Sequence, residues 1–492
     1  MIPLPFKTDL ALLAPELFLA GMALLLILVG AFYGDRSARL IHVIAILGLF
    51  TCALELASEA KLWSATLAFH GMFSTDMFAL TFKVLCLTGA AFALMISVPP
   101  LRAQNMMRFE YPVLVTLSVL GMMLMISAHS FLTLYMGLEL SSLALYVLAA
   151  FRRDNVLSAE AGMKYFILGA LASGMLLFGI SLVYGFSGTL DFQGVATGLA
   201  AHAPAHHGVT IGMVFILVAL VFKLSGVPFH MWTPDVYQGA PTPVTAFFAM
   251  VPKMAAFAVL LQLLFGPFAA LRDSWAPIIL FVAVASMIWG AVAAVVQTNI
   301  KRLIAYAAIT NIGYALLGVV AGTAAGISAS ILFLGIYLIM TAGFFAAVLS
   351  IQTESGDEVQ DIQDLAGLSR THPLVAYLLV VMLFAMAGIP PLAGFFGKFV
   401  VFQSLVQAGY YGVAVLGVVA SVVAAYYYLK IIRTMFFDAP VGITQLRIDG
   451  GQQLVALAAV LFVLVFILAS QPFYHLATQA AQVIVPATPL NP

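Results

Sequence analysis

The sequence predicts an all-α polytopic membrane protein with about fourteen transmembrane helices. The 492-residue chain is 63% hydrophobic and 8% charged, whereas a typical soluble domain is about 25% charged. No soluble core could bury so much apolar surface, so a bilayer must solvate part of it. The apolar runs are long, and they lack the short alternating pattern of an outer-membrane barrel.

The candidate spans follow one another along the whole chain. A spanning helix needs about 20 mostly apolar residues. Runs of this kind begin near residues 10, 40, 75, 109, 130, 158, 209, 241, 275, 301, 326, 373, 410 and 452. No small-residue cleavage signature follows the first run, so we interpret it as a retained helix and not as a signal peptide.

Cationic residues are concentrated on one side of the predicted membrane. The loops after odd-numbered spans, together with the end of span thirteen, contain Arg36, Arg39, Arg102, Arg108, Arg152, Arg153, Lys301, Arg302, Arg370, Lys430, Arg433 and Arg447. The opposite side contains only Lys7, Lys61 and Arg272. Cytoplasmic loops are enriched in Lys and Arg. We therefore expect a multi-pass membrane protein with both termini facing away from the cytoplasm.

Two predicted spans are interrupted by helix-breaking residues. Span seven contains Ser-Gly-Val-Pro at 225–228, and span twelve contains Gly-Ile-Pro-Pro at 388–391. Each interruption falls in the fourth member of a five-helix set, comprising spans four to eight and spans nine to thirteen. An odd number of spans per set inverts the second set, and paired broken helices in inverted repeats indicate an ion pathway.

These landmarks divide the chain into four predicted parts. They are an N-terminal three-helix segment (1–108), a first inverted repeat (109–268), a second inverted repeat (269–437), and a C-terminal helix and tail (438–492). The longest polar stretch, 352–372, is rich in acids. It is expected to be a solvated cytoplasmic loop or a docking surface for another subunit.

Ionisable residues lie inside several apolar runs, where an ionised side chain costs about 2.5 to 3.5 kcal/mol. The candidate functional residues are Glu139, Lys164, Lys223, Lys253 and Lys398. For the lysines the alternative is snorkelling to the membrane surface. For the glutamate it is a protonated structural carboxyl. Lys83 has no evident acidic partner in the sequence, so we interpret it as snorkelling or structural.

These residues permit proton transfer. Burial favours release of a proton from a lysine, and a nearby carboxylate holds the lysine charged. Movement of Glu139 relative to Lys223 would therefore switch the lysine between holding and releasing a proton. His230 follows the break in span seven and could relay protons, although a hydrogen-bonded structural histidine is the alternative.

Other chemical motifs are weak or absent. The two cysteines have no metal or redox spacing, and Phe399 stands where a phosphate loop needs Ser or Thr. The loop histidines His202, His206 and His207 could bind a metal, although a plain loop is the simpler interpretation. We expect no cofactor and no metal in this chain, and no nucleic-acid partner.

Three motifs resemble a known family. KLSGVPFHMWTPDVYQGAPTPVTAFFAMVPK (223–253), NIKRLIAYAAITNIGYALLG (299–318) and AGIPPLAGFFGKF (387–399) are similar to signatures of the antiporter-like subunits of respiratory complex I. The segment WTPDVYQGAP is most similar to the N-type branch of this family. The resemblance covers essentially the whole chain.

The resemblance implies a proton-translocating membrane subunit of an NADH:quinone oxidoreductase. By this resemblance, Glu139 would pair with Lys223, and His230 would match the family's histidine after the helix break. A hydrated path would continue through Lys164, Lys253 and Lys398. The resemblance also implies a place in the bacterial inner membrane, with both termini on the periplasmic side. Lipids and partner subunits would surround this chain, namely antiporter-like neighbours and a small K-type subunit. FMN, iron–sulfur clusters and quinone would belong to partner subunits.

Two other functions stay open on the sequence. One is a subunit of a multi-subunit cation/proton antiporter, which has no redox role and shares the broken helices and the lysines. The other is a membrane spacer whose buried charges only hold helices together. Several costly central lysines argue against a spacer.

Overall fold

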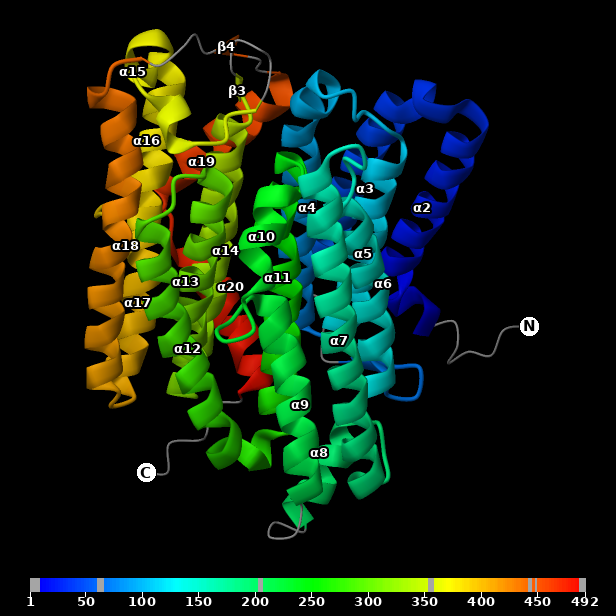
Figure 1. Ribbon diagram of the computed structural model, residues 1–492. Coiled ribbons are helices and arrows are strands. Elements are labelled where there is room, and N and C mark those ends of the chain that lie inside the picture. The colour runs from blue at the N-terminus through cyan, green and yellow to red at the C-terminus, as the bar shows by residue number, and fades with distance from the viewer. Residues whose placement is uncertain are drawn as a thin grey trace.

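The chain folds into a bundle of helices in the computed structural model (Figure 1). The structure describes residues 9–59, 66–201, 207–352, 358–440, 445–446 and 449–485. The predicted landmarks Lys7, Lys61, His202, His206 and Arg447 lie outside these residues.

The elements of the first half alternate long helices with short connections. They are α2 (Ala14–Tyr33), the 3₁₀ helix η1 (Gly34–Ser37), α3 (Ala38–Glu59), β1 (Thr66–Ala68), β2 (Phe73–Thr75), α4 (Met77–Ala103), α5 (Glu110–Ile126), α6 (Phe131–Ala149), α7 (Val156–Ser187), α8 (Phe192–Ala201), α9 (His207–Leu224), α10 (Trp232–Gly239) and α11 (Thr242–Phe265). Side-chain caps fix several starts: Asp76 accepts from Ala79 N at the start of α4, and Asn155 accepts from Ser158 N at the start of α7.

The second half continues the same pattern. Its elements are η2 (Ala269–Leu271), α12 (Arg272–Val295), α13 (Ile300–Ala321), α14 (Ala324–Val348), β3 (Ile351–Gln352), η3 (Ile362–Leu365), α15 (Leu368–Thr371), α16 (Pro373–Ala387), α17 (Ala393–Gln407), α18 (Tyr411–Phe437), β4 (Gln445–Leu446), α19 (Gly450–Val465) and α20 (Gln471–Ile484). The strands form two small antiparallel pairs, β1 with β2 and β3 with β4. In Figure 1, α15, β3 and β4 lie at one end of the bundle and α8 at the other.

Both predicted helix interruptions are present. Helix α9 ends at Leu224 and α10 begins at Trp232, while α16 ends at Ala387 and α17 begins at Ala393. The chain leaves each helix through a left-handed residue, Ser225 with φ of 65° and Gly388 with φ of 86°. Proline follows in both breaks and cannot supply the next helical N–H bond.

Three helices form the centre of the bundle. Helices α11, α13 and α14 are almost entirely buried, whereas only about a third or less of the run from Ala14 to Ser58 and of α18 is buried. The core of a membrane bundle is where a charged side chain can be kept from lipid. Lys253 lies on α11 and is therefore in the most enclosed layer.

Close packing fixes the position of α6 against α5. A Cβ on Gly121 would lie 2.5 Å from the backbone nitrogen of Ser141, and a Cβ on Gly137 would lie 2.7 Å from that of Met125. Glycines at such positions let two helices approach closely. This contact holds the helix that carries Glu139.

Counting spans by helix length gives a different number from counting apolar runs in the sequence. Among the described residues, ten helical runs are long and apolar enough to cross a membrane, with Ala14–Ser58 counted as one run. Three shorter apolar helices are Glu110–Ile126, Pro373–Ala387 and Gly450–Val465. The all-helical membrane architecture is confirmed, and fourteen spans in two inverted repeats stay a prediction.

Two segments that the sequence predicts as a loop and a tail contain folded structure within the described residues. The polar stretch 352–372 is folded where the structure describes it, because Ile300 N donates to Gln360 O (2.8 Å) at the start of α13. After α19 the chain forms a further helix, α20, whose alanine face packs on α14 and α4. Its sequence is too polar to be recognised as a span.

Candidate functional site

The candidate residues are distributed over five helices and one break. Glu139 lies on α6, Lys164 on α7, Lys223 in the last turn of α9, Lys253 on α11 and Lys398 on α17. His230 lies in the interruption between α9 and α10. The structure brings some of these side chains together and separates others.

Lys223 is held by the polar face of α6. Its Nζ donates to Ser142 Oγ (2.7 Å) and lies 3.5 Å from the hydroxyl of Tyr146, with the ring centroid of Tyr146 at 5.5 Å. Helix α9 ends one residue after this lysine, at Leu224, and the left-handed Ser225 follows. The ammonium therefore has polar contacts within the bundle and does not need to reach the membrane surface.

Glu139 belongs to the same face of α6 but makes no ion pair within the described part of the chain. Ser142 follows it by three residues and Tyr146 by seven, which places all three side chains along one side of a helix. Glu139 Oε1 is buried without a hydrogen-bond partner among the described residues. Ser142 is the direct contact of Lys223, and the expected pairing of Glu139 with Lys223 stays a prediction.

Lys223 and Lys253 line the same enclosed cavity. The cavity has a volume of about 20 Å³ and is also lined by Ser142, Tyr165 and Trp232. A cavity needs roughly 10 to 15 Å³ of such space to hold one water molecule. The cavity is therefore large enough for one water molecule in contact with both lysine-bearing helices.

Lys253 has few contacts of its own. It is buried, and its Nζ has no hydrogen-bond partner among the described residues. The ammonium lies 5.6 Å from the ring centroid of Tyr237 on α10. A buried cation with so little direct compensation is costly, and water in the adjacent cavity would supply the missing acceptor.

Lys398 closes the break between α16 and α17. Its Nζ donates to Met386 O (3.1 Å), Ala387 O (3.1 Å) and Ser421 Oγ (3.0 Å), and it lies 5.1 Å from the ring centroid of Tyr314. The two carbonyls are at the end of α16, where they have no helical partner. Lys398 also lines an open apolar groove of about 750 Å³ between α17 and α18.

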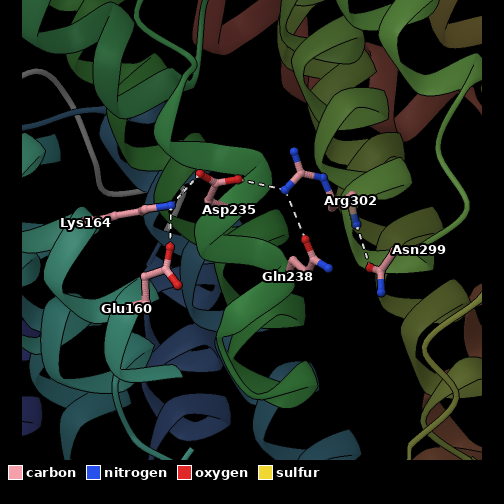
Figure 2. Close-up of polar contacts among 6 residues, drawn as sticks. All are labelled: Glu160, Lys164, Asp235, Gln238, Asn299 and Arg302. Carbon is pink, nitrogen blue, oxygen red and sulfur yellow. Dashed lines mark hydrogen bonds and ion pairs between the residues drawn. The ribbon is translucent and has the colours of Figure 1, made fainter. Parts of the chain in front are cut away.

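Lys164 and His230 lie apart from the enclosed cavity. Lys164 is 41% exposed and pairs with Glu160 (2.7 Å) and Asp235 (2.8 Å) at the surface (Figure 2). His230 is half-buried, and its ring stacks edge-on against Trp289 of α12 at 6.2 Å. Their roles in a proton path stay predictions, and neither residue lines the cavity of Lys223 and Lys253.

Two charged clusters were not predicted from the sequence. Lys83 has an acidic partner: its Nζ lies 2.6 Å from Glu16 Oε1, and the two side chains are 0% and 2% exposed. Asp235 pairs with Arg302 (2.7 Å) as well as with Lys164. The partners lie 67 or more residues apart in sequence, so no local spacing could have connected them.

Metal binding has no support in this part of the chain. Among the described residues, no group of three or more His, Cys, Asp or Glu side chains could hold a metal ion. The cysteines Cys52 and Cys86 are buried and free. The chemistry that this arrangement permits is transfer of protons between buried amines.

Comparisons with known proteins agree with one family. The family model described as "NADH:quinone oxidoreductase/Mrp antiporter, TM" matches residues 128–424. NADH-quinone oxidoreductase subunit N of Paramagnetospirillum magneticum is 48% identical over 483 residues, covering 97% of this chain and 99% of that protein. Subunit N 1 of Rhizobium meliloti is 47% identical, covering 96% and 98%.

Solved structures share the fold. A chain of respiratory complex I from Thermus thermophilus, solved with bound aureothin, is 32% identical with a TM-score of 0.78, covering 94% of this chain and 99% of that one. A chain of the Mrp complex from Dietzia sp. DQ12-45-1b is 24% identical with a TM-score of 0.85, covering 97% and 98%, which is a likeness of fold. The matched signatures, the broken helices and the extent of these similarities show that this chain belongs to the NADH-quinone oxidoreductase subunit N family of antiporter-like membrane proteins.

Proposed function

We propose that this chain is the proton-translocating membrane subunit of an NADH:quinone oxidoreductase and that Lys223 and Lys253 are its central proton carriers. The cavity that both lysines line is the main support, because it could hold the water molecule that a proton transfer between them requires. Relatives that match nearly the whole chain are named subunit N of this enzyme.

Glu139 sets the charge of Lys223 in this proposal. Attraction to the carboxylate favours the protonated lysine, and desolvation favours the neutral one. Ser142 and Tyr146 hold the ammonium in place while this balance changes. When the attraction weakens, the proton passes through the cavity to Lys253.

The path from Lys253 towards Lys398 crosses α14. This helix packs against both α11 and α17, which carry the two lysines. Tyr337 of α14 donates its hydroxyl to Ala249 O (3.2 Å), one turn before Lys253. Tyr314 lies beneath Lys398 at the other side. Buried tyrosines and water would carry the proton across this interval.

The helices and the charges support a proposed membrane topology. Dividing the run Ala14–Ser58 at η1 and adding the three shorter apolar helices to the other nine runs gives fourteen spans. We propose that 109–268 and 269–437 are inverted repeats, between a three-helix segment (1–108) and a C-terminal part (438–492). Both termini then face the periplasm, and Arg302 faces the cytoplasm.

The redox chemistry belongs to partner subunits in this proposal. We place the FMN, iron–sulfur and quinone sites in those subunits, and we expect this chain to contact antiporter-like neighbours, a small K-type subunit and lipids. Electron transfer elsewhere in the complex would drive the change at Glu139.

Replacement of Lys223 tests the function. In vesicles that contain the whole complex, Lys223→Ala should abolish proton pumping, and Lys223→Arg should hold the site charged and also stop pumping. The complex must still contain its flavin and iron–sulfur subunits. Normal pumping by Lys223→Ala would refute the proposed role of this lysine.

An Mrp-type antiporter subunit is the second candidate. The high TM-score to the Dietzia Mrp complex supports it at the level of fold, although the relatives at 47% and 48% identity are subunits of the oxidoreductase. Purification of the native assembly distinguishes the two. Flavin and iron–sulfur absorbance in the purified assembly supports the oxidoreductase, and a membrane-only assembly supports the antiporter.

A further inference from the structure

Asp235 forms the centre of a charged cluster outside the lysine cavity. Its Oδ1 accepts from Arg302 at 2.7 Å, and its Oδ2 accepts from Lys164 at 2.8 Å (Figure 2). Arg302 also donates to Gln238 (3.0 Å) on the same short helix. One carboxylate therefore connects α7, from the first proposed repeat, with α13, from the second.

The helix that carries Asp235 has little support from its own chain. Helix α10 has eight residues, and a non-helical stretch separates it from α9. So short a helix is held mainly by its contacts with neighbouring elements. At its C-terminal end, Lys301 donates to Ala240 O (2.9 Å), and near its start Trp232 Nε1 donates to Phe222 O (2.9 Å). Asp235 ties the middle of α10 to α7 and α13 from the outer side.

The inner side of α10 contacts the site of the proposed proton transfer. Trp232 lines the cavity shared by Lys223 and Lys253 and stacks on Tyr165 with ring centroids 4.6 Å apart. Tyr237 places its ring 5.6 Å from Lys253 Nζ and donates its hydroxyl to Phe248 O (3.0 Å). A shift of α10 would therefore change the size of the cavity and the surroundings of Lys253 together.

We propose that Asp235 is a positioning residue for proton transfer, because its two ion pairs fix α10, and with it Trp232 and Tyr237, against the Lys223–Lys253 cavity. This inference rests on the proposed function. Lys164 then acts as an anchor of α10 and not as a carrier. The three charged side chains are 41%, 37% and 29% exposed for Lys164, Asp235 and Arg302. Exposed ion pairs contribute little to overall stability, so removing them should change pumping more than assembly.

The test compares Asp235→Asn with Asp235→Glu in the assembled complex. Asparagine is isosteric and removes the charge, whereas glutamate keeps it. Proton uptake per NADH oxidised should fall about twofold or more in Asp235→Asn, and Asp235→Glu should restore most of it. Electron transfer per complex should be less affected. A parallel loss of assembly, electron transfer and pumping would overturn the proposal, because it indicates a purely structural residue.

Glu160→Gln is the matched control. Glu160 pairs with Lys164, and among the described residues no ion pair joins it to α10. Hydrogen–deuterium exchange of the peptide 232–240 in the whole complex reports how readily α10 opens locally. Exchange should increase in Asp235→Asn and stay unchanged in Glu160→Gln. Equal effects of the two substitutions, or no effect of Asp235→Asn on exchange and pumping, would contradict the proposal.

Two further variants keep the test decisive. If Asp235→Asn does not assemble, Lys164→Gln and Arg302→Gln each remove one of the two ion pairs and should each lower pumping per electron. If neither of these does so, Asp235 has no positioning role. Lys223→Ala is measured in parallel. Normal pumping in that variant would refute the proposed carrier, whereas normal pumping in Asp235→Asn alone would refute only the positioning role.

Discussion

Replacing Glu16 and Lys83 singly and together measures the energy of the most deeply buried ion pair described. The pair joins α2 to α4, with Lys83 Nζ 2.6 Å from Glu16 Oε1 and side chains 2% and 0% exposed. Lys83 also lies 4.9 Å from the ring centroid of Phe73. Glu16→Gln and Lys83→Met keep approximate size while removing one charge each.

The magnitude follows from the separation and the burial. At 2.6 Å and an effective dielectric constant of about 20, the Coulomb attraction is about 6 kcal/mol. Desolvation of both groups offsets part of this attraction. Either single substitution leaves one buried charge unpaired and should cost about 3 to 5 kcal/mol. The double substitution removes both charges and should cost less than either single one.

Unfolding of the full chain in mixed micelles, followed by far-ultraviolet circular dichroism, gives the three free energies. The expected result is a coupling free energy of more than about 3 kcal/mol between the two positions. If Glu16→Gln is as stable as the unsubstituted chain, the two groups are not an ionised pair and the reasoning fails.

Four further substitutions test other parts of the structure. Tyr146→Phe removes a hydroxyl 3.5 Å from Lys223 Nζ and should slow pumping without preventing assembly; an unchanged rate would remove Tyr146 from the site. Tyr337→Phe should impair pumping if the route crosses α14, and vesicle acidification measures this loss, whereas normal acidification would exclude Tyr337. Gly121→Leu overpacks the α5–α6 contact and should cost at least about 1 to 3 kcal/mol, read as lower yield of assembled complex; a normal yield would show that the helices can separate. Burial lowers the pKa of His129, outside the spans, below its ordinary 6.5. The unfolded chain therefore binds more protons below about pH 6.5, and stability falls as the pH decreases; His129→Gln should reduce this acid sensitivity in thermal unfolding at pH 5 and 7, and an unchanged slope would contradict it.

Much of the fold could be predicted because membrane helices leave local signals. Proline and glycine at 225–228 and 388–391 predict the two breaks, and both breaks are present. The apolar runs predict the long helices. Helix α20 could not be predicted as part of the bundle, because its contacts with α14 and α4 depend on tertiary packing and not on hydropathy.

The candidate site was only partly predictable. A lysine near the middle of an apolar run predicts a side chain inside the helix bundle. Lys223, Lys253 and Lys398 all lie within the bundle and contact other helices. The position of a lysine within an apolar run could not distinguish Lys164 from these buried lysines, and Lys164 lies at the surface with Asp235. That position also could not show that Glu16 is the partner of Lys83, because contacts between helices that are distant in the sequence leave no periodic pattern in it.

Proton pumping by the reconstituted complex with Lys253→Met tests whether the translocated protons pass through Lys253. Methionine fills a similar volume but cannot carry a proton, so the cavity wall is kept while transfer beyond Lys223 is blocked. Acidification of proteoliposomes is recorded with electron transfer from NADH to quinone, and Lys253→Arg serves as the charged comparison. Both variants should assemble, and acidification per electron should fall sharply in each. Full acidification by Lys253→Met would show that protons do not pass through this lysine.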